Sequence, residues 1–204
     1  PFIFVQIFLV RLYLIATFKL GCRQSKWFTK KWYNLFSILC GKVFAEFGCL
    51  NYGYSSKELD KLAMQEEDVK ERYQKQLYHH VISSTGISSA DGLKILEVGS
   101  GRGGGISYIA RSFKPQEVIG LELSSSAVDY CAQKYKGIGN LRFMQGDAEN
   151  IPFSDGYFDI VINVESSHCY PNFIGFVDEV VRVLKPGGYF AITDCRYSNK
   201  LEDF

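Results

Sequence analysis

Short apolar runs alternate with amphipathic stretches along the chain from about residue 90 onward. The apolar runs are rich in β-branched residues, which is typical of buried strands, and the stretches between them have helical spacing. The runs predict strands at residues 93–99, 117–123, 141–147, 157–165 and 187–195, and the stretches predict helices at 104–113, 125–136 and 171–185. This alternation indicates an α/β fold in which helices cover both faces of a parallel sheet.

Residues at the ends of these segments fit the predicted boundaries. Serines stand where they can cap the helix at 125–136, and Pro171 stands where the first turn of the next helix is expected. The stretch "KPGG" at 185–188 is expected to end that helix and to turn the chain into the fifth strand. Upstream, residues 55–82 predict one long helix that begins with a capping box formed by Ser55 and Glu58.

The first twenty residues are mostly apolar, a length that can cross a bilayer as a helix. Arg11 in their middle opposes insertion by about 2.5–3.5 kcal/mol, so an interfacial helix, or a helix packed on the domain, competes with a span. Aromatic and basic residues follow at 26–33, a mixture found where chains leave the membrane. We expect membrane association through residues 1–20 with the domain at the cytoplasmic face, or otherwise a cytoplasmic protein.

Length and composition limit the number of domains. With 204 residues, of which 47% are hydrophobic, the chain can bury one core but hardly two. We divide it into a hydrophobic segment at 1–20, a helical lead-in and lid at 21–90, and an α/β domain at 91–204. The six cysteines form no CxxC pair and there are three histidines, so the sequence predicts neither a metal site nor a disulfide framework.

Five glycines stand within "ILEVGSGRGGG" at 95–105, directly after the first apolar run. Bare backbone between a strand and a helix lets a ligand approach closely and offers it free N–H groups. Gly99, Gly101 and Gly104 fit the dinucleotide pattern G-x-G-x-x-G, and Glu122 follows where a ribose-binding acid is expected. This loop alone does not separate NAD from other cofactors that contain adenosine.

Two further acids favour one of these cofactors. Glu97 would repel the pyrophosphate of NAD but suits the ammonium of an aminoacyl group carried on adenosine, as in S-adenosylmethionine; alternatively, it only ends a strand at the surface. Asp147 follows the third strand, so it should lie with Glu122 at the carboxyl edge of the sheet, where ligands bind in open α/β folds. There Asp147 can accept a hydrogen bond from the adenine amine, and Ala148 can donate its N–H to the ring.

Five successive motifs resemble those of the class I, Rossmann-like S-adenosylmethionine-dependent methyltransferases: "ILEVGSGRGGG", "VIGLELS", "GDAENIPF", "FDIVINVESSHCYPN" and "VLKPGGYFAITD". Within these enzymes the chain is most similar to the methyltransferase type 11 group that includes the phthiotriolone dimycocerosate methyltransferases and, more distantly, the sterol methyltransferases. The resemblance covers about residues 50–196. It implies a Rossmann-like sheet with five of the seven family strands present, so the chain is expected to be a fragment that is truncated at both ends.

The resemblance also implies a role for each site residue. The glycine loop and Glu97 would hold the cofactor, Glu122 its ribose, Asp147 and Ala148 its adenine, and the residues at 163–165 would face the methionine arm and the reactive methyl. The cofactor-binding set would be Glu97, Gly99, Ser100, Gly101, Gly103, Glu122, Leu123, Asp147, Ala148, Asn163 and Val164. A lid would come from Tyr52, Tyr54 and Gln76, for which ordinary packing is the alternative.

Methyl transfer from a sulfonium is an in-line displacement, which depends mainly on alignment in a dry pocket. A hydroxyl acceptor also needs a base, and His168 stands where it can take the proton, unless it only hydrogen-bonds the backbone of its loop. Glu165 is expected to shape the pocket or bind the acceptor rather than to act as the base. His79 and His80 are expected to be structural.

The expected activity is therefore methyl transfer from S-adenosylmethionine to a small hydrophobic or lipid-like acceptor. A non-catalytic module that binds this cofactor, or a membrane-tethered partner protein, would keep the loop and lose turnover. An NAD-dependent oxidoreductase would share the loop and Glu122 but leaves Glu97 and Asp147 unexplained. Residues 1–50 carry a net charge of +6 and the remainder −5, so the α/β domain offers nucleic acid no basic surface.

Overall fold

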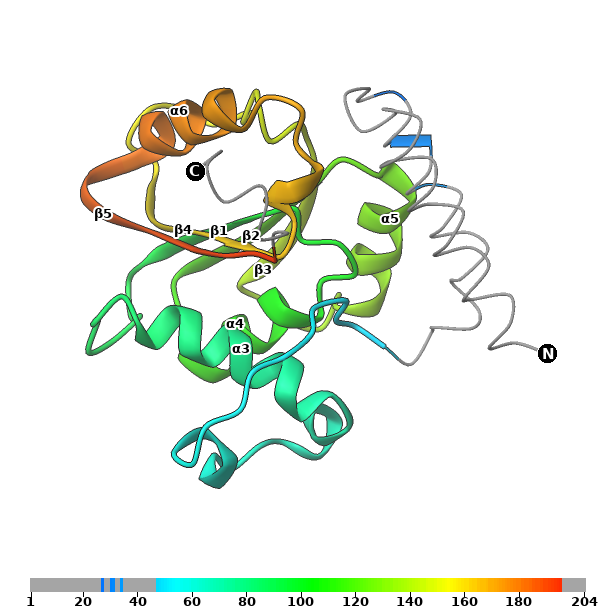
Figure 1. Cartoon of the computed structure of the whole chain (residues 1–204), viewed down its shortest axis with the longest axis vertical. Helices are drawn as coiled ribbons and strands as arrows, with labels where there is room; N and C mark the ends of the chain where they lie inside the picture. The colour runs from blue at the N-terminus through cyan, green and yellow to red at the C-terminus, as the bar shows by residue number, and fades with distance from the viewer. Residues whose placement is uncertain (1–26, 28–29, 32–33, 35–46, 196–204) are drawn as a thin grey trace.

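The computed structural model describes residues 27, 30, 31, 34 and 47–195 (Figure 1). Its centre is a five-stranded parallel sheet, as the sequence predicts, and the strands lie in the order β3-β2-β1-β4-β5. The strands are β1 (Lys94–Val98), β2 (Glu117–Glu122), β3 (Leu141–Gln145), β4 (Phe158–Val164) and β5 (Leu184–Thr193). Because the strands are parallel, their carboxyl ends lie at one edge, and the strand order reverses between β1 and β4, where open α/β sheets bind ligands.

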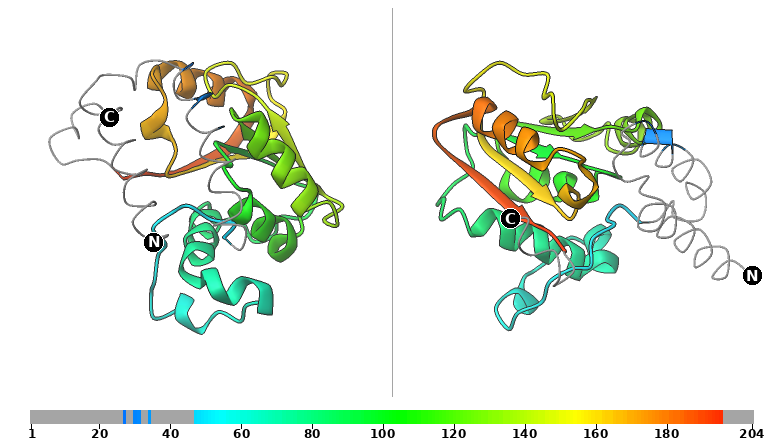
Figure 2. Two further views of the ribbon diagram at one scale, coloured as in Figure 1. Left: turned by 90° about the vertical axis from the view of Figure 1, so that its right-hand side faces the viewer. Right: turned by 45° about the horizontal axis from the view of Figure 1, so that its top comes forward.

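Helices cover both faces of this sheet (Figures 1 and 2). On one face, α3 (Arg72–Ser83) and α4 (Gly104–Phe113) pack on Ile95 of β1, and on the other face α6 (Phe173–Val183) packs on Leu96 and Val98. The remaining helix, α5 (Ser125–Lys134), lies against β2 and β3. Since side chains alternate along a strand, Glu97 shares the face of Ile95 and lies toward α3.

The start of β5 differs from the prediction. The sequence predicts that "KPGG" turns the chain between helix and strand, but α6 already ends at Val183 and β5 begins at Leu184. The four residues lie inside β5, where Gly187 has a positive φ of 80° and the pairing register with β4 shifts between Phe158 and Ile160. A local irregularity in the strand therefore replaces the expected turn.

The helix starts agree with the prediction in one case and differ in another. Ser124 caps α5 as predicted, because its side chain accepts a hydrogen bond from the backbone of Ala127. Pro171 is not in the first turn of α6. Asn172 occupies the capping position instead, and its side chain accepts a hydrogen bond from Gly175 N–H at 2.9 Å, which places Pro171 outside the helix.

The long helix predicted at 55–82 is wrong. Two short 3-10 helices, η3 (Leu59–Lys61) and η4 (Glu66–Glu71), precede α3, and the capping box of Ser55 and Glu58 does not form. The cause is a set of long-range hydrogen bonds: Gln76 donates to the Leu59 carbonyl at 2.6 Å and Arg72 donates to the Leu62 carbonyl at 3.0 Å. These bonds fold the segment back on α3, which a continuous helix could not do.

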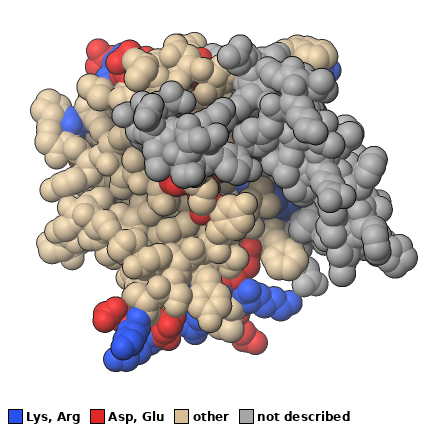
Figure 3. All heavy atoms as spheres, viewed as in Figure 1, with Lys and Arg blue, Asp and Glu red and all other residues tan. Residues whose placement is uncertain are grey.

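Charged side chains of both signs gather over η3 and η4, at the bottom of the face in Figure 3. Most of the rest of that face carries other residues, apart from the part that the structure does not describe. A surface of mixed charge gives no extended field of one sign there.

The hydrophobic segment predicted at 1–20, with the aromatic and basic residues at 26–33, falls almost entirely outside the described residues. Among the residues that are described, no helix has the length and apolar character needed to cross a bilayer. The membrane association expected from the sequence therefore stays a prediction.

Gly105, in α4, tests the packing of α3 on the sheet. Alanine normally favours a helix over glycine by about 1 kcal/mol, but a Cβ at Gly105 would overlap the ring of Tyr78. We expect Gly105→Ala to lower the free energy of unfolding by about 1–3 kcal/mol in chemical denaturation. The control is Gly137→Ala, since a Cβ there meets no atom of the described residues within 4 Å. Equal stabilities of the two variants would contradict this packing.

Candidate functional site

The glycine loop, residues 99–103, joins the end of β1 to the start of α4. Gly99, Gly101 and Gly103 have positive φ angles of 76°, 53° and 74°, which other residues rarely adopt. A Cβ at Gly99 or Gly103 would also overlap neighbouring side chains, whereas a Cβ at Gly101 would meet only Leu50, at 3.9 Å, in the described part of the chain. Gly101 therefore leaves room for a ligand to approach the backbone.

Glu122, the last residue of β2, lies beside this loop. One carboxylate oxygen accepts a hydrogen bond from Gly101 N–H and the other accepts one from Ser124 N–H, both at 2.9 Å. Burial raises the pKa of Glu122, and the backbone donors offset part of that effect. The acid predicted to hold a ribose is thus at the loop, at the carboxyl edge of the sheet.

Glu97 is fully buried rather than at the surface. Its Oε1 accepts a hydrogen bond from the Tyr78 hydroxyl at 2.6 Å, and its Oε2 has no partner among the described residues. Burial is the largest effect on this group and raises the pKa of Glu97 to about 8, although the Tyr78 hydrogen bond opposes the shift. A buried carboxylate oxygen without a donor is costly, which indicates that a ligand completes this site.

A segment that we term the roof, residues 47–54, lies over the glycine loop. The Gly48 carbonyl accepts a hydrogen bond from Gly104 N–H at 2.8 Å, and the Phe47 carbonyl accepts one from the Arg102 side chain at 2.9 Å. In Figure 1 the roof is the cyan segment that passes beside the start of α4. The first N–H of α4 is therefore already capped by the protein itself.

Two of the three predicted lid residues belong to the roof. Tyr52 has a side chain that is 84% exposed, and Tyr54 stacks on His80 of α3 with 4.5 Å between the ring centroids. Gln76 is not in the roof. It is fully buried in α3, and its side chain donates a hydrogen bond to the Leu59 carbonyl of η3.

Asn163 and Val164 close the end of β4. The Asn163 amide donates hydrogen bonds to the Val98 carbonyl at 2.9 Å and to the Ser166 hydroxyl at 2.8 Å, and its Oδ1 has no partner among the described residues. Val164 lies on the opposite face, in the core beneath α3 and α4. Asn163 therefore ties β4 to β1 at the point where the strand order reverses.

The residues predicted to hold an adenine lie farther along the same edge. Asp147 follows β3 and accepts a hydrogen bond from Glu149 N–H at 2.9 Å, in a turn that also pairs it with Asn150. Leu123 is connected to the end of β3, because its backbone carbonyl accepts a hydrogen bond from the Gln145 side chain at 3.2 Å. Ala148 is partly buried and packs on the α6 side of the sheet. In the glycine loop, Ser100 is buried and its hydroxyl has no partner among the described residues.

His168 is paired with a carboxylate that the sequence analysis missed. It lies in the 3-10 helix η5 (Ser167–Cys169) that follows β4, and its Nδ1 is 2.7 Å from Asp194 Oδ1, at the end of β5. Asp194 also accepts hydrogen bonds from the backbone N–H of His168 and from the Ser167 hydroxyl. Burial alone would lower the pKa of His168, but the hydrogen bonds to Asp194 and Cys169 outweigh it and raise the pKa to about 10.

The pairing could have been anticipated from one signal. Asp194 directly follows β5 in "AITDC", and the carboxyl ends of parallel strands meet at one edge. A carboxylate after the fifth strand is thus delivered to the same place as the residues after the fourth. Burial would raise the pKa of Asp194, but the hydrogen bonds from His168 and Ser167 outweigh it and lower the pKa. Asp194 and His168 therefore form an ion pair at neutral pH.

Glu165 contacts the roof rather than His168. It has a positive φ of 48°, an unusual conformation for a residue with a Cβ, and its Oε2 accepts a hydrogen bond from Tyr52 N–H at 3.0 Å. Burial is the main cause that raises the pKa of Glu165. Backbone strain of this kind is retained where the surrounding structure requires it, often at functional sites.

No disulfide or metal cluster marks the site within the described ranges. The cysteines there form no disulfide, and no group of three or more His, Cys, Asp or Glu residues is placed to hold a metal ion. The buried Cys131 thiol donates a hydrogen bond to the Gly101 carbonyl at 3.4 Å, and burial raises its pKa. At neutral pH it therefore acts as an uncharged donor that supports the glycine loop.

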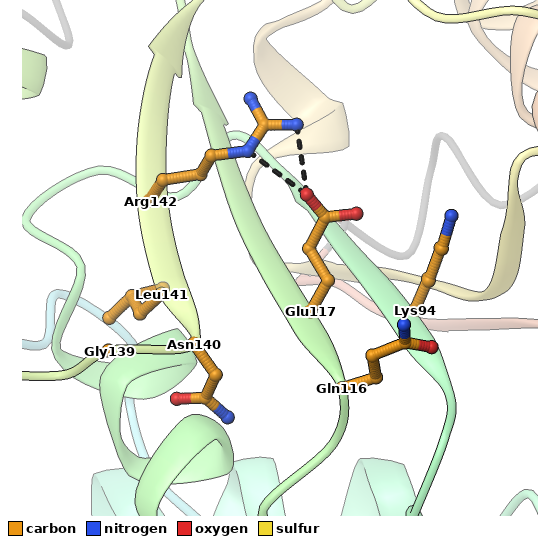
Figure 4. Close-up of a pocket in the computed structure, with 7 residues that line it drawn as sticks. All are labelled: Lys94, Gln116, Glu117, Gly139, Asn140, Leu141 and Arg142. Carbon is orange, nitrogen blue, oxygen red and sulfur yellow. Dashed lines mark hydrogen bonds and ion pairs between the residues drawn. The ribbon is translucent and has the colours of Figure 1, made fainter.

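A groove of about 370 Å³ lies at the opposite, amino edge of the sheet (Figure 4). Arg142 crosses it and binds Glu117 Oε1 through Nε and Nη2, each at 3.1 Å. Its lining is formed by Lys94, Gln116, Glu117, Gly139, Asn140, Leu141 and Arg142. None of the predicted site residues lines it, and it opens at the edge away from the glycine loop, so we do not assign the site to this groove.

Known proteins match the chain across this site. The family model described as a methyltransferase domain matches residues 96–192. A fatty-acid O-methyltransferase of Mycolicibacterium smegmatis is 48% identical, over 72% of this chain and 52% of its own length. A probable phthiotriol/phenolphthiotriol dimycocerosates methyltransferase 2 of Mycobacterium ulcerans is 38% identical, over 89% of this chain and 68% of its own length.

Among solved structures, the cyclase SpnF matches with a TM-score of 0.67 at 24% identity, over 83% of this chain and 61% of that one. This likeness shows the fold alone. The chain spans 52% and 62% of the first two curated relatives that it matches.

The pairing of His168 with Asp194 can be tested by titration. We expect the imidazole to titrate near pH 10 in the wild type and at a clearly lower pH in Asp194→Asn, because the lowering by burial is then opposed only by the contacts with Cys169. The measurement is an NMR pH titration of the ring carbon, assigned with His168→Gln. The ring of His79, whose pKa burial lowers, should titrate unchanged in both proteins. An equal pKa of His168 in the wild type and in Asp194→Asn would disprove the pairing.

Proposed function

This chain belongs to the class I, Rossmann-like S-adenosylmethionine-dependent methyltransferases of the type 11 group, and we propose that it transfers a methyl group from S-adenosylmethionine to an oxygen of a lipid-like acceptor. The observation that carries the cofactor assignment is Glu97. It is a fully buried carboxylate, two residues before the glycine loop, with one oxygen that lacks a donor. The ammonium of an aminoacyl group would supply that donor and compensate for the cost of burying the carboxylate.

The rest of the cofactor would follow the carboxyl edge of the sheet. We assign the ribose hydroxyls to Glu122, which ends β2 beside Gly101. We assign the adenine to Asp147 and Ala148, because they follow β3 at the same edge. Gly99, Ser100 and Gly103 would maintain the conformation of the loop. Leu123, directly after β2, and Asn163 and Val164, at the end of β4, would support the cofactor from the sheet.

NAD fits this arrangement poorly. A pyrophosphate would need free N–H groups at the start of α4, but Gly104 N–H is bonded to the Gly48 carbonyl and Gly101 N–H to the Glu122 carboxylate. It would also meet Glu97. SpnF shares the fold and is a cyclase by name, so the fold alone does not establish methyl transfer and turnover is the test of it.

When bound, S-adenosylmethionine supplies an electrophilic methyl group on a sulfonium. The residues of this chain would provide binding, orientation and exclusion of water. Glu97 would fix the aminoacyl portion and Glu122 the ribose. Asn163 would hold β4 against β1, and the roof would exclude water from the loop. Glu165 would keep the roof in place at Tyr52.

His168 would act on the acceptor, and two acceptor classes make opposite demands on it. A hydroxyl needs a neutral imidazole that removes its proton, whereas a carboxylate is already ionised and needs a cation that holds it. The ion pair with Asp194 keeps the imidazole protonated at neutral pH, and its side chain is 34% exposed, so a ligand can reach it. Of the two classes, we favour a carboxylate.

A lipid-like acceptor is supported by the roof and by the relatives. Phe47, Leu50 and Tyr52 expose large apolar side chains over the glycine loop. The matched relatives are named for a fatty acid and for phthiotriol dimycocerosates. We further propose that residues 1–20 bring the domain to the cytoplasmic face of a membrane, where such acceptors concentrate.

Cofactor binding should depend on pH through Glu97. Because its pKa is raised to about 8, the carboxyl carries a proton at pH 7 that a bound ammonium would expel. We expect the Kd for S-adenosylhomocysteine to fall up to tenfold per unit between about pH 6 and 8 and then to level off, with proton release visible by calorimetry in buffers of different ionisation enthalpy.

Glu97→Gln should bind more weakly and lose this pH dependence, while NAD titrated in parallel should not bind the wild type. Binding of NAD alone would overturn the methyltransferase assignment. Tight S-adenosylhomocysteine binding by Glu97→Gln would remove the role given to Glu97.

Acceptor class should appear in the pH profile of methyl transfer. With a long-chain fatty acid, we expect a low KM up to about pH 10 and a rise above it, as His168 loses its charge. With the corresponding fatty alcohol, kcat should instead increase with pH toward that value. His168→Ala should slow both reactions but leave the Kd for S-adenosylhomocysteine within about twofold. Absence of transfer to either acceptor by the full chain would favour a non-catalytic binding role.

A further inference from the structure

A cluster of buried charges lies between the roof, α3 and α4, apart from every residue assigned above. Asp68, Glu71 and Lys75 are 2%, 7% and 3% exposed, and Arg111 of α4 joins them through Asp68 at 2.7 Å. Burying charges is costly, and apolar residues often stabilise a core equally well. The cluster therefore calls for a reason beyond stability of the core.

Glu71 binds the roof directly. Its Oε1 accepts hydrogen bonds from Gly48 N–H at 2.9 Å and from Cys49 N–H at 2.7 Å, and its Oε2 also approaches Gly48 N–H at 3.0 Å. A carboxylate that accepts two adjacent backbone donors holds them more firmly than neutral acceptors do. This one side chain thus satisfies two successive N–H groups of the roof.

Lys75 connects the same cluster to the cofactor loop. Its Nζ donates to the Gly104 carbonyl at 2.5 Å and lies 3.9 Å from Glu71 Oε2 and 3.6 Å from Asp68 Oδ1. Gly104 is the first residue of α4 and follows the glycine loop directly. Two residues four positions apart, Glu71 at the end of η4 and Lys75 in the first turn of α3, therefore hold the roof and the loop, respectively.

The roof and the loop also touch each other at Gly104. Its N–H donates to the Gly48 carbonyl, and a Cβ at Gly104 would overlap the backbone of Gly48. A Cβ at Gly48 would lie 3.0 Å from Gly104 Cα and 2.7 Å from the Tyr135 hydroxyl. The two glycines allow backbone to pack on backbone, so a displacement of the roof would also displace the start of α4.

We infer that Glu71 is a positioning residue for the cofactor, which acts by fixing the roof at Gly48 and Cys49 against the glycine loop. This rests on the proposed function, because the ligand concerned is S-adenosylmethionine. With the carboxylate in place, the roof holds Gly104 and encloses the loop. Without it, two roof N–H groups lose their acceptor, Lys75 loses a counter-ion, and the bound cofactor escapes more readily.

The test compares Glu71→Gln with Glu67→Gln. Glu67 is the matched control, since its side chain is 62% exposed and pairs only with Arg111 among the described contacts. In the full chain we expect Glu71→Gln to raise the Kd for S-adenosylhomocysteine and the KM for S-adenosylmethionine by at least tenfold, through faster dissociation, with kcat at saturation changed less than about threefold. Glu67→Gln should leave all of these values within twofold.

Hydrogen exchange of residues 47–54 provides a readout without cofactor. We expect these amides to exchange at least tenfold faster in Glu71→Gln than in Glu67→Gln. A wild type that binds no S-adenosylhomocysteine would refute the proposed function, whereas fast exchange would still support the attachment of the roof. Equal Kd values and equal exchange in the two variants would overturn the inference.

If Glu71→Gln does not fold, Gly48→Ala displaces the roof without altering the charges. It should give the same rise in Kd, and an unchanged Kd would again overturn the inference.

Discussion

Parallel pairing of β1 with β2 and β4 is the constraint on which the site depends. The pairing fixes Val98 opposite Leu121 on one side, and on the other side it sets Glu97 opposite Ile162. It therefore delivers the glycine loop, Glu122 and Asn163 to one edge without help from any ligand. The cross-link from Asn163 to the Val98 carbonyl then holds that edge where the order of strands reverses. The segments over this edge are attached to what the sheet delivers there, because the roof bonds Gly104 at the end of the glycine loop and η5 bonds Asp194 directly after β5.

Alternation along β1 explains why the central acid can be buried. Ile95 and Glu97 lie toward α3 and α4, and Leu96 and Val98 lie toward α6. An apolar residue at position 97 would suit this environment better, so Glu97 interrupts the run of apolar residues along β1. Tyr78 satisfies one carboxylate oxygen and leaves the other without a partner among the described residues. Such a local conflict is expected where function rather than stability selects the residue.

The parts of the structure that follow from local pattern could be predicted from the sequence, and those that follow from distant contacts could not. All five strands, the helix that begins in the glycine loop and the cap at Ser124 are local features. The long helix at 55–82 was wrong because Gln76 bonds a carbonyl 17 residues earlier, and no local pattern reports such a bond. Asp194 was missed for the same reason: it lies 26 residues from His168 in sequence but 2.7 Å away in space.

The two ends of the site differ in charge before any ligand binds. Burial raises the pKa of Glu97 to about 8 and so favours its neutral form at neutral pH, whereas Asp194 favours the charged form of His168. The end of the site assigned to the cofactor under the proposed function would therefore lack the charge of Glu97 before a ligand binds, whereas the end at His168 already carries an ion pair with Asp194. A cation entering near Glu97 would convert a protonated acid into a counter-ion, so binding would create the charge that retains it. A carboxylate entering near His168 would meet a cation already in place, because Asp194 has fixed the proton there in advance. Under the proposed function, the same edge of the sheet would thus receive two ligands of opposite charge, and Glu97 and His168 would each select one of them through a protonation state that the fold sets in advance.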